Sequence, residues 1–197
     1  MSETQETTRR LPAGERRREI VRAALRVFAS TSYAGATTAE IARQARVSEP
    51  VIYRHFVSKR DLWLACLDAA WNETRAMLED RIASSVTHST PSVSRSPWPS
   101  PTMPNLWIQG LTEVSEDPVA RRAIRRHMRE VHDVVEETVR RGQSSGAIPA
   151  DRSAEAEAWI FIGDGLLRSV ADRLGGVPTS GDLEAISRER IRWLTGG

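Results

Sequence analysis

The sequence predicts an all-α protein, in which an N-terminal three-helix domain with a helix-turn-helix precedes a larger helical body. Apolar residues recur at helical spacing almost throughout, and no segment alternates polar and apolar residues for long enough to form a sheet. Two short helical segments lie within residues 37–59, separated by a tight connection. The charge also changes along the chain: residues 1–60 carry 12 basic and 6 acidic side chains, whereas residues 61–197 carry 16 and 20. We therefore expect one domain over 1–60 and a second over 61–197.

The composition excludes several classes of protein. With 197 residues, 40% hydrophobic and 27% charged, the chain has enough apolar side chains for a folded core. No apolar run approaches the roughly 18 residues of a membrane span, and the polar N-terminus does not resemble a signal peptide. The single cysteine, Cys66, excludes a disulfide scaffold. We expect a cytoplasmic protein that does not contact a membrane.

Three helices are predicted in the N-terminal domain. The first covers about residues 15–30, because Ile20, Ala24 and Phe28 form one apolar stripe, which Val27 completes. Thr37 and Glu40 have the spacing of a capping box, which predicts a second helix over about 38–45. The third is expected over 48–56, where Ser48 stands at the N-cap and Pro50 lies in the first turn.

The body is predicted to contain five further helices. The first begins near Lys59 and has an apolar side formed by Leu67, Trp71, Thr74, Leu78 and Ile82. Residues 88–104 hold five of the ten prolines, so we expect a Pro/Ser-rich loop there. The five ranges are about 59–84, 105–115, 118–141, 153–173 and 182–194. The third has a start signal at Asp117-Pro118 and an apolar stripe of Ile124, Met128, Val131, Val135 and Val139.

The face of the third helix carries the functional prediction. If Ile52 and Phe56 point inward, together with Ile41 and Val47, the remaining side chains of this helix face outward or sideways. Such side chains suit double-stranded DNA: Arg54 can bond guanine, and carboxylate and apolar side chains can read other base edges. Hydroxyl, imidazole and ammonium groups can hold phosphates. The predicted DNA contacts are Thr37, Thr38, Arg46, Ser48, Glu49, Pro50, Val51, Tyr53, Arg54, His55 and Lys59.

These residues resemble the signature of the tetracycline-repressor (TetR) family of bacterial transcription regulators. The matching positions are Thr37, Ile41-Ala42, Val47-Ser48, Ile52 to Phe56 and Ser58-Lys59, and the resemblance covers residues 15–65. It implies that Thr37, Tyr53, His55 and Lys59 are anchors on the DNA backbone. The chain departs from the family at Arg46, where glycine is usual, and at Pro50, where a small residue is frequent.

The resemblance also implies a C-terminal domain that binds a small effector and forms a homodimer through its last two helices. The predicted helix over 153–173 is apolar on nearly every side, which fits a helix covered by its own core and by a partner. An intramolecular core without a partner is the alternative. The predicted interface residues are Leu166, Leu167, Val170, Ile186, Ile191 and Leu194.

We expect a largely apolar or aromatic effector among the middle helices, because tryptophan and methionine suit such ligands. The alternative for each of these side chains is an ordinary place in the core. Asp164 and Arg168, four residues apart, are expected to form an ion pair rather than a ligand contact. The candidate effector contacts are Trp71, Met77, Trp107, Leu111, Met128, His132, Trp159 and Ile162.

The sequence also contains patterns that resemble catalytic or metal-binding motifs, but none of them is convincing. Residues 142–146 fit the nucleophile-elbow pattern, but no strand is predicted before them. His127 and His132 are five apart and do not share a helical face, and His132 with Glu136 is a weak zinc candidate. We predict no catalytic residue, no cofactor and no metal. The rival classes are a small enzyme with an acid or base among Asp164, His127 and His132, and a protein-interaction module.

These features predict a homodimeric DNA-binding regulator, most simply a repressor that an effector releases from a palindromic operator. The same domain could serve a transcriptional activator. Twofold symmetry implies half-site centres one helical turn apart, roughly 34–36 Å, or a small multiple of it. The helix beginning at Lys59 is the expected lever between the domains. The arginines at 9, 10 and 16–18 are expected to form a basic arm on the DNA.

Overall fold

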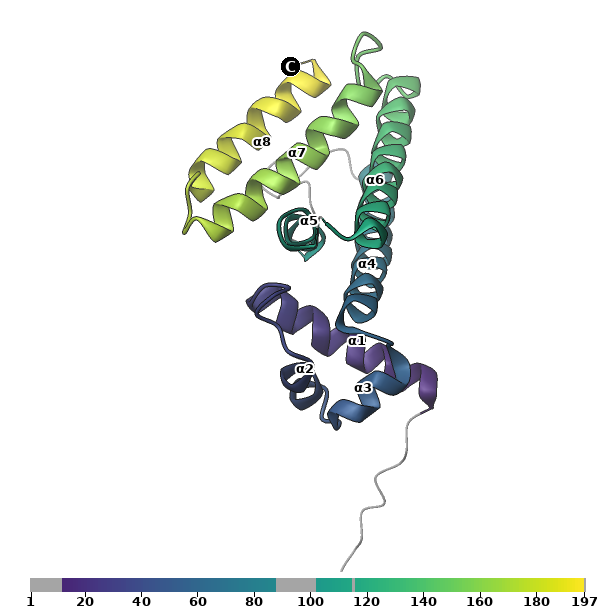
Figure 1. Ribbon diagram of the computed structural model, residues 1–197. Helices are drawn as coiled ribbons and strands as arrows, with labels where there is room; N and C mark the ends of the chain where they lie inside the picture. The colour runs from purple at the N-terminus through teal and green to yellow at the C-terminus, as the bar shows by residue number, and fades with distance from the viewer. Residues whose placement is uncertain (1–11, 88–101, 115, 197) are drawn as a thin grey trace, which may run out of the picture. The chain divides into compact units, whose positions relative to one another are not determined.

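The computed structural model describes residues 12–87, 102–114 and 116–196, and for residues 80–87 it describes the backbone alone. The described residues form helices and turns without any strand (Figure 1). The predicted all-α fold class is confirmed. Among the described residues, no helix is both long and apolar enough to cross a membrane. The helices are α1 (Ala13–Ser30), α2 (Thr38–Gln44), α3 (Glu49–His55), α4 (Lys59–Thr87), α5 (Thr102–Glu113), α6 (Pro118–Ser144), α7 (Ala154–Arg173) and α8 (Ser180–Thr195).

The chain divides into two compact units, and the division falls inside α4. The N-terminal unit extends to Cys66, and the second begins at Leu67. One continuous helix therefore contributes its first two turns to one unit and the rest to the other.

Apolar burial organises the N-terminal unit as the sequence predicts. The predicted stripe of α1 is buried, with Ile20, Ala24 and Phe28 fully inaccessible to solvent. The first turns of α4 add Trp63 and Cys66, which are equally buried. Burial also raises the pKa of the Cys66 thiol, because desolvation penalises the thiolate. This cysteine is a core residue and a poor nucleophile.

The caps of the N-terminal helices are only partly as predicted. The Thr37 hydroxyl accepts a hydrogen bond from the Glu40 backbone N–H at 3.1 Å. The Glu40 side chain does not complete the predicted capping box, because it accepts two hydrogen bonds from Arg43, at 2.9 and 2.6 Å. These bonds lower the pKa of the Glu40 carboxyl. Ser48 stands at the N-cap of α3 without a side-chain hydrogen bond.

In the second unit, α6 packs against α7, and α5 packs against both. The predicted stripe of α6 is buried at Ile124, Val131, Val135 and Val139, and Met128 is half-buried. Asp117 begins the helix as predicted. Its carboxylate accepts hydrogen bonds from the next two available backbone N–H groups, at 2.8 and 3.2 Å.

One predicted loop boundary is wrong. The loop was expected to reach residue 104, but α5 begins at Thr102, and both Met103 and Pro104 are buried within its first turn. Proline is compatible with a first turn, since the backbone N–H groups there have no partner within the helix. Residues 88–101 of the predicted loop, Arg9 and Arg10 of the basic arm and the side chain of Ile82 lie outside the described part of the chain.

A buried ion pair and a hydrogen bond from a second pair join α7 to α8, which lie alongside each other (Figure 1). The predicted pair within α7 is confirmed, because Arg168 donates to Asp164 at 2.8 Å. Arg168 also donates to the hydroxyl of Ser187 in α8 at 2.6 Å. Glu157, only 1% exposed, accepts from Arg190 of α8 at 3.0 Å. Each buried carboxylate thus has a guanidinium partner.

We predict that Arg190→Met lowers the free energy of unfolding by about 3 kcal/mol, because it leaves the Glu157 carboxylate buried without its partner. Urea denaturation at one fixed protein concentration measures this change. The control is Arg192→Met, which removes an exposed pair with Glu189 and costs about 0.5 kcal/mol or less. Equal effects of the two variants would contradict the account.

Candidate nucleic-acid interface

The turn between α2 and α3 requires an unusual backbone conformation at Arg46. Its φ is +54°, which lies in the left-handed region that favours glycine. This conformation lets the Val47 N–H donate to the Ala42 carbonyl at 3.0 Å. The sequence departs from the TetR pattern at this position, yet the turn keeps the left-handed geometry that glycine would adopt.

Apolar contacts fix the orientation of α3. Ile41 of α2 and Ile52 of α3 are 0% and 1% exposed, and Phe56, which follows α3, is 1% exposed. Ala42 is also buried, whereas Val47, which was predicted to point inward, is half-buried. Since three large apolar side chains face inward, the opposite side of α3 must face solvent.

The outward side of α3 carries the side chains that the sequence predicted for DNA. Tyr53 is 51% exposed, and both Pro50 and Arg54 are also exposed. The remaining predicted residues of α3 lie at the edges of this face and are half-buried: Glu49, Val51 and His55. In the part of the chain that the structure describes, no residue accepts a hydrogen bond or ion pair from Arg54, so its guanidinium is available for a base or a phosphate.

A polar contact connects α2 to α3 next to this face. The Thr38 hydroxyl donates a hydrogen bond to the Glu49 carboxylate, and it also lies 3.2 Å from the Tyr53 hydroxyl. Glu49 is therefore engaged within the protein. A contact from Glu49 to a base edge, as the sequence predicts, would compete with this hydrogen bond.

Lys59, the only lysine of the chain, has a second role that sequence reasoning missed. Its ammonium donates to the carbonyls of Tyr33 and Ala36 at 2.8 and 3.0 Å, and it lies 4.6 Å from the centre of the Tyr33 ring. Lys59 thereby fixes the loop between α1 and α2 to the start of α4. One of its three N–H donors is left for a phosphate.

Of the eight predicted effector residues, six are buried or half-buried and two are exposed. Trp71, Trp107, His132 and Ile162 are buried, and Met77 and Met128 are half-buried. Leu111 and Trp159, in contrast, are 48% and 49% exposed. The His132 and Trp159 rings lie 4.7 Å apart, so the structure brings these two together.

The six predicted dimer residues are at least partly accessible to solvent. None of the six is buried, and Ile186 is 41% exposed. Two further apolar residues of these helices are exposed, Ile160 of α7 at 47% and Trp193 of α8 at 51%. Sequence reasoning named neither as an interface residue, although helical spacing places Ile160 near Leu167.

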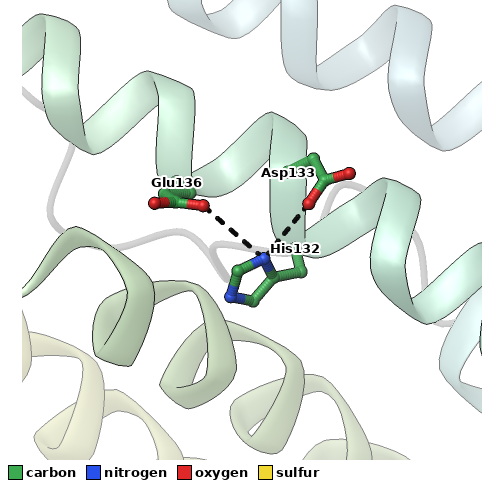
Figure 2. Close-up of side chains that lie close together, drawn as sticks. All are labelled: His132, Asp133 and Glu136. Carbon is green, nitrogen blue, oxygen red and sulfur yellow. Dashed lines mark hydrogen bonds and ion pairs between the residues drawn. The ribbon is translucent and has the colours of Figure 1, made fainter.

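His132, Asp133 and Glu136 of α6 are the one group of described residues with the ligand types and spacing for a metal (Figure 2). Their ligand atoms lie within 4.8 Å of one another, and the imidazole Nδ1 faces both carboxylates. Two features disfavour a metal. Arg140 already donates to Glu136 at 2.5 Å, and the buried Nε2 of His132 has no hydrogen-bond partner among the described residues, whereas metal-bound histidines usually have one.

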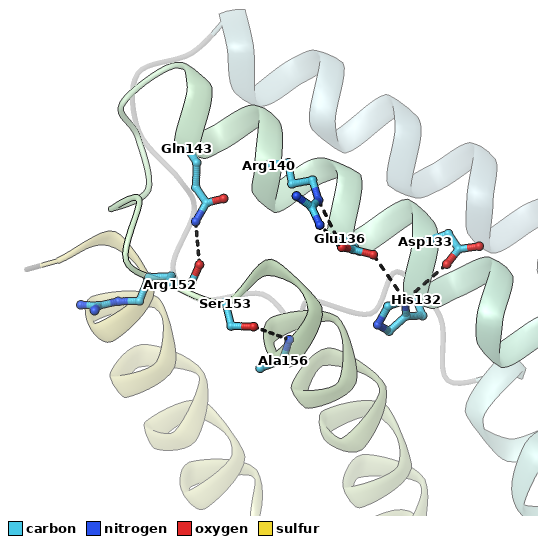
Figure 3. A network of polar contacts seen from close by, with 8 residues as sticks. All are labelled: His132, Asp133, Glu136, Arg140, Gln143, Arg152, Ser153 and Ala156. Atoms are coloured by element: carbon cyan, nitrogen blue, oxygen red, sulfur yellow. Dashed lines mark hydrogen bonds and ion pairs between the residues drawn. The ribbon is translucent and has the colours of Figure 1, made fainter.

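Figure 3 shows the same charged residues and, nearer the end of α6, a separate set of polar contacts at the turn into α7. Arg140 neutralises Glu136, and Gln143 donates to the carbonyls of Pro149 and Arg152 at 3.2 and 2.7 Å. These bonds hold the turn that leads into α7. The nucleophile-elbow pattern at 142–146 lies within this helix end and turn, as predicted, and follows no strand.

The N-terminal unit is similar in sequence to known transcription regulators. Residues 20–66 match the model of "Bacterial regulatory proteins, tetR family". Over 58 residues the chain is 50% identical to the HTH-type transcriptional activator FasR of Mycolicibacterium smegmatis. This match covers 29% of the chain and 26% of FasR, so the similarity spans about a quarter of that relative.

Solved structures show that the fold of the whole chain is shared. A protein from Rhodococcus sp. assigned to the TetR-family regulators has a TM-score of 0.73 at 17% identity, covering 92% of this chain and 99% of its own. A transcriptional regulator from Saccharomonospora viridis, solved in complex with choline, has a TM-score of 0.69 at 21% identity, covering 91% and 96%. At these identities the likeness concerns the fold.

We predict that Arg46→Gly raises the free energy of unfolding by about 0.5–1 kcal/mol, because glycine adopts the left-handed conformation without steric cost. The matched control is Gln44→Gly, an exposed position at the end of α2 with ordinary helical geometry, which lowers stability by up to about 1 kcal/mol. Urea denaturation of both variants measures the difference. A loss of stability in Arg46→Gly would show that the guanidinium contributes more than the backbone strain costs.

Proposed function

We propose, on the premise that residues 20–66 belong to the tetR family of bacterial regulatory proteins, that the protein is a sequence-specific DNA-binding transcriptional regulator. The observation that carries the proposal is the inward burial of Ile52 and Phe56, which leaves Tyr53 and Arg54 of α3 exposed. A short helix with this exposed face, preceded by a tight turn, has the geometry that enters a major groove.

Within this proposal, the residues of the interface have two roles. Arg54 reads a guanine through a bidentate pair, and Val51 packs on a thymine methyl. Thr37, Tyr53 and His55 hold phosphates and set the register. Lys59 uses its remaining N–H on a phosphate while its other two maintain the loop between α1 and α2.

The proposed active species is a homodimer on a palindromic operator. The exposed apolar residues of α7 and α8, Ile160, Ile186 and Trp193, support a twofold interface between two copies. Twofold symmetry would place two α3 helices in successive major grooves, with half-site centres roughly 34–36 Å apart or a small multiple of it.

We propose a small, largely apolar or aromatic effector in the second unit, near the adjoining rings of His132 and Trp159. The choline complex of the Saccharomonospora viridis protein supports a small-molecule ligand in a protein of this fold. The effector would shift the population toward dimers whose α3 spacing no longer fits the operator, with α4 as the lever. Repression is the simplest form of this mechanism, and activation, as in FasR, is the alternative.

No enzymatic role is proposed. Two of the three rival acids and bases, Asp164 and His127, are already held by described partners, Arg168 and Asp68. Within the described part of the chain, the recorded contacts of the His132 ring are with Asp133, Glu136 and Trp159, none of which is a hydroxyl or thiol nucleophile. Conversion of a bound effector by the purified protein would favour the enzyme.

We predict that Arg54→Ala weakens binding to the selected operator by about 1–3 kcal/mol and relaxes the preference at one base pair in each half-site. Selection of binding sequences from a random duplex library, followed by gel shift, measures both effects. The unaltered protein is expected to select an inverted repeat. The matched control is Arg22→Ala, an exposed arginine of α1, which leaves the base preference unchanged.

A lack of sequence preference in the unaltered protein at moderate salt would contradict the regulator and favour a protein-interaction module. An unchanged base preference in Arg54→Ala would remove this residue from base readout while leaving the regulator in place.

We predict that Ile186→Glu shifts the protein from dimer to monomer, because two carboxylates would be buried at the twofold interface. Sedimentation velocity over a range of protein concentrations measures the change. The control is Val119→Glu, a similarly exposed apolar residue (37%, against 41% for Ile186) at the start of α6. A protein that sediments as a monomer before substitution would contradict the proposed dimer.

A further inference from the structure

A dense group of arginines lies on α6, in the second of the two units. Five of the ten residues from 121 to 130 are arginine, and Glu130 is the one acid among them. This group stands in a part of the chain that is otherwise acidic, since residues 61–197 carry 16 basic and 20 acidic side chains. The charge is therefore concentrated locally.

Three of these arginines have no ion-pair partner within the described residues: Arg122, Arg125 and Arg129. Their spacing of three and four residues places them on one side of the helix. All three are exposed. Arginines three or four residues apart repel one another, so an anion that binds between them would relieve this repulsion.

The fourth arginine, Arg126, is held in place. It donates to Asp68 of α4 at 2.9 Å and lies 3.6 Å from Glu130. Asp68 is itself fixed by the buried His127, whose Nε2 lies 2.9 Å from the same carboxylate oxygen. The hydrogen bond from His127 lowers the pKa of the Asp68 carboxyl, with a further contribution from Arg126, so this carboxylate stays charged. The contact therefore fixes one side of the arginine group to α4.

Together these side chains line an open groove of about 530 Å³, formed by Arg122, Arg125, Arg126, Arg129 and Glu130. Sites for small ligands commonly have volumes of about 300–1,000 Å³, so the groove is larger than a single inorganic phosphate needs. Among the described lining residues, Arg126 is already paired with Asp68, so the unpaired positive charge comes from Arg122, Arg125 and Arg129. A multiply charged anion matches such a lining best.

We propose that this groove binds the diphosphate group of a phosphorylated small molecule, such as a nucleoside diphosphate. The planar guanidiniums of Arg122, Arg125 and Arg129 suit the bidentate recognition of phosphate oxygens. Glu130 repels further negative charge and accepts a hydrogen bond from a hydroxyl of the same ligand. The groove shares no described lining residue with α3 or with the His132–Trp159 pair, so the proposal goes beyond the proposed function and does not depend on it.

Isothermal titration calorimetry of the full chain with ADP, pyrophosphate, AMP and inorganic phosphate tests the proposal, at about 150 mM salt to screen non-specific attraction. One ADP is expected per chain, with pyrophosphate also binding and with AMP and inorganic phosphate markedly weaker. Arg122→Gln/Arg129→Gln is expected to weaken ADP binding by roughly tenfold or more, because two charge-assisted contacts are lost.

The matched control is Arg140→Gln/Arg141→Gln, which removes the same charge from the same helix. These two arginines pair with Glu136 and Glu137, and neither lines the groove. The control is expected to bind ADP as the unaltered protein does. Thermal unfolding of both variants verifies that they are folded.

Three results would overturn the proposal: no measurable ADP binding, an equal loss in both double variants, or unchanged ADP binding in the groove variant. A parallel titration with a DNA duplex of scrambled sequence tests whether the arginines bind nucleic acid instead of a diphosphate. If the groove variant loses affinity for the duplex while its affinity for ADP is unchanged, the arginines contact nucleic acid, and the diphosphate site is wrong.

Discussion

The burial of Ile52 and Phe56 is the contact on which the functional face of this protein depends. Both α2 and α3 have only seven residues, too few to form stable helices alone in water. Their orientation therefore comes from the apolar core of the N-terminal unit, in which these two side chains and Ile41 are buried. Reversal of that burial would turn Arg54 inward and place apolar side chains where DNA is expected.

Two further contacts keep this small unit in one arrangement. The left-handed backbone at Arg46 sets the turn between α2 and α3, and Lys59 fixes the loop between α1 and α2 to the start of α4. Because the ammonium of Lys59 satisfies two backbone carbonyls, its position at the proposed DNA surface is defined before any phosphate binds. Preorganisation of this kind reduces the entropy lost on binding.

Charge is used differently in the second unit. Glu157 and Asp164 are buried, and each is neutralised by an arginine, which makes these pairs part of the core that joins α7 to α8. The arginines at 122, 125 and 129 instead face solvent without a described partner. The arginines paired with buried carboxylates therefore stabilise the fold, whereas the unpaired arginines of the proposed groove are available to bind an anion.

Much of the fold could be predicted because helix starts and apolar stripes are local signals. Asp117 and Thr37 cap their helices as expected, and Ile52 and Phe56 are buried as their spacing requires. The start of α5 was placed too late, because proline density hides a first turn in which proline is acceptable.

Contacts between distant segments gave no such local signal. The bonds from Lys59 to Tyr33 and Ala36, and the bridge from Asp68 to Arg126 and His127, depend on how separate helices pack. The spacing of arginines on α6 was visible, but which of them have partners depends on α4. Sequence reasoning therefore found the face of α3 and missed both the Lys59 contact and the groove.

Site-directed cleavage of DNA tests the central claim most directly, namely that the exposed face of α3 lies in a major groove. The buried, weakly reactive Cys66 leaves a cysteine introduced by Pro50→Cys as the one accessible thiol for an iron chelate. We expect cleavage confined to the major groove of each operator half-site, and none from a chelate attached through Ala150→Cys in the turn before α7. Absent or uniformly distributed cleavage from Pro50→Cys on DNA that the protein still binds would contradict the account.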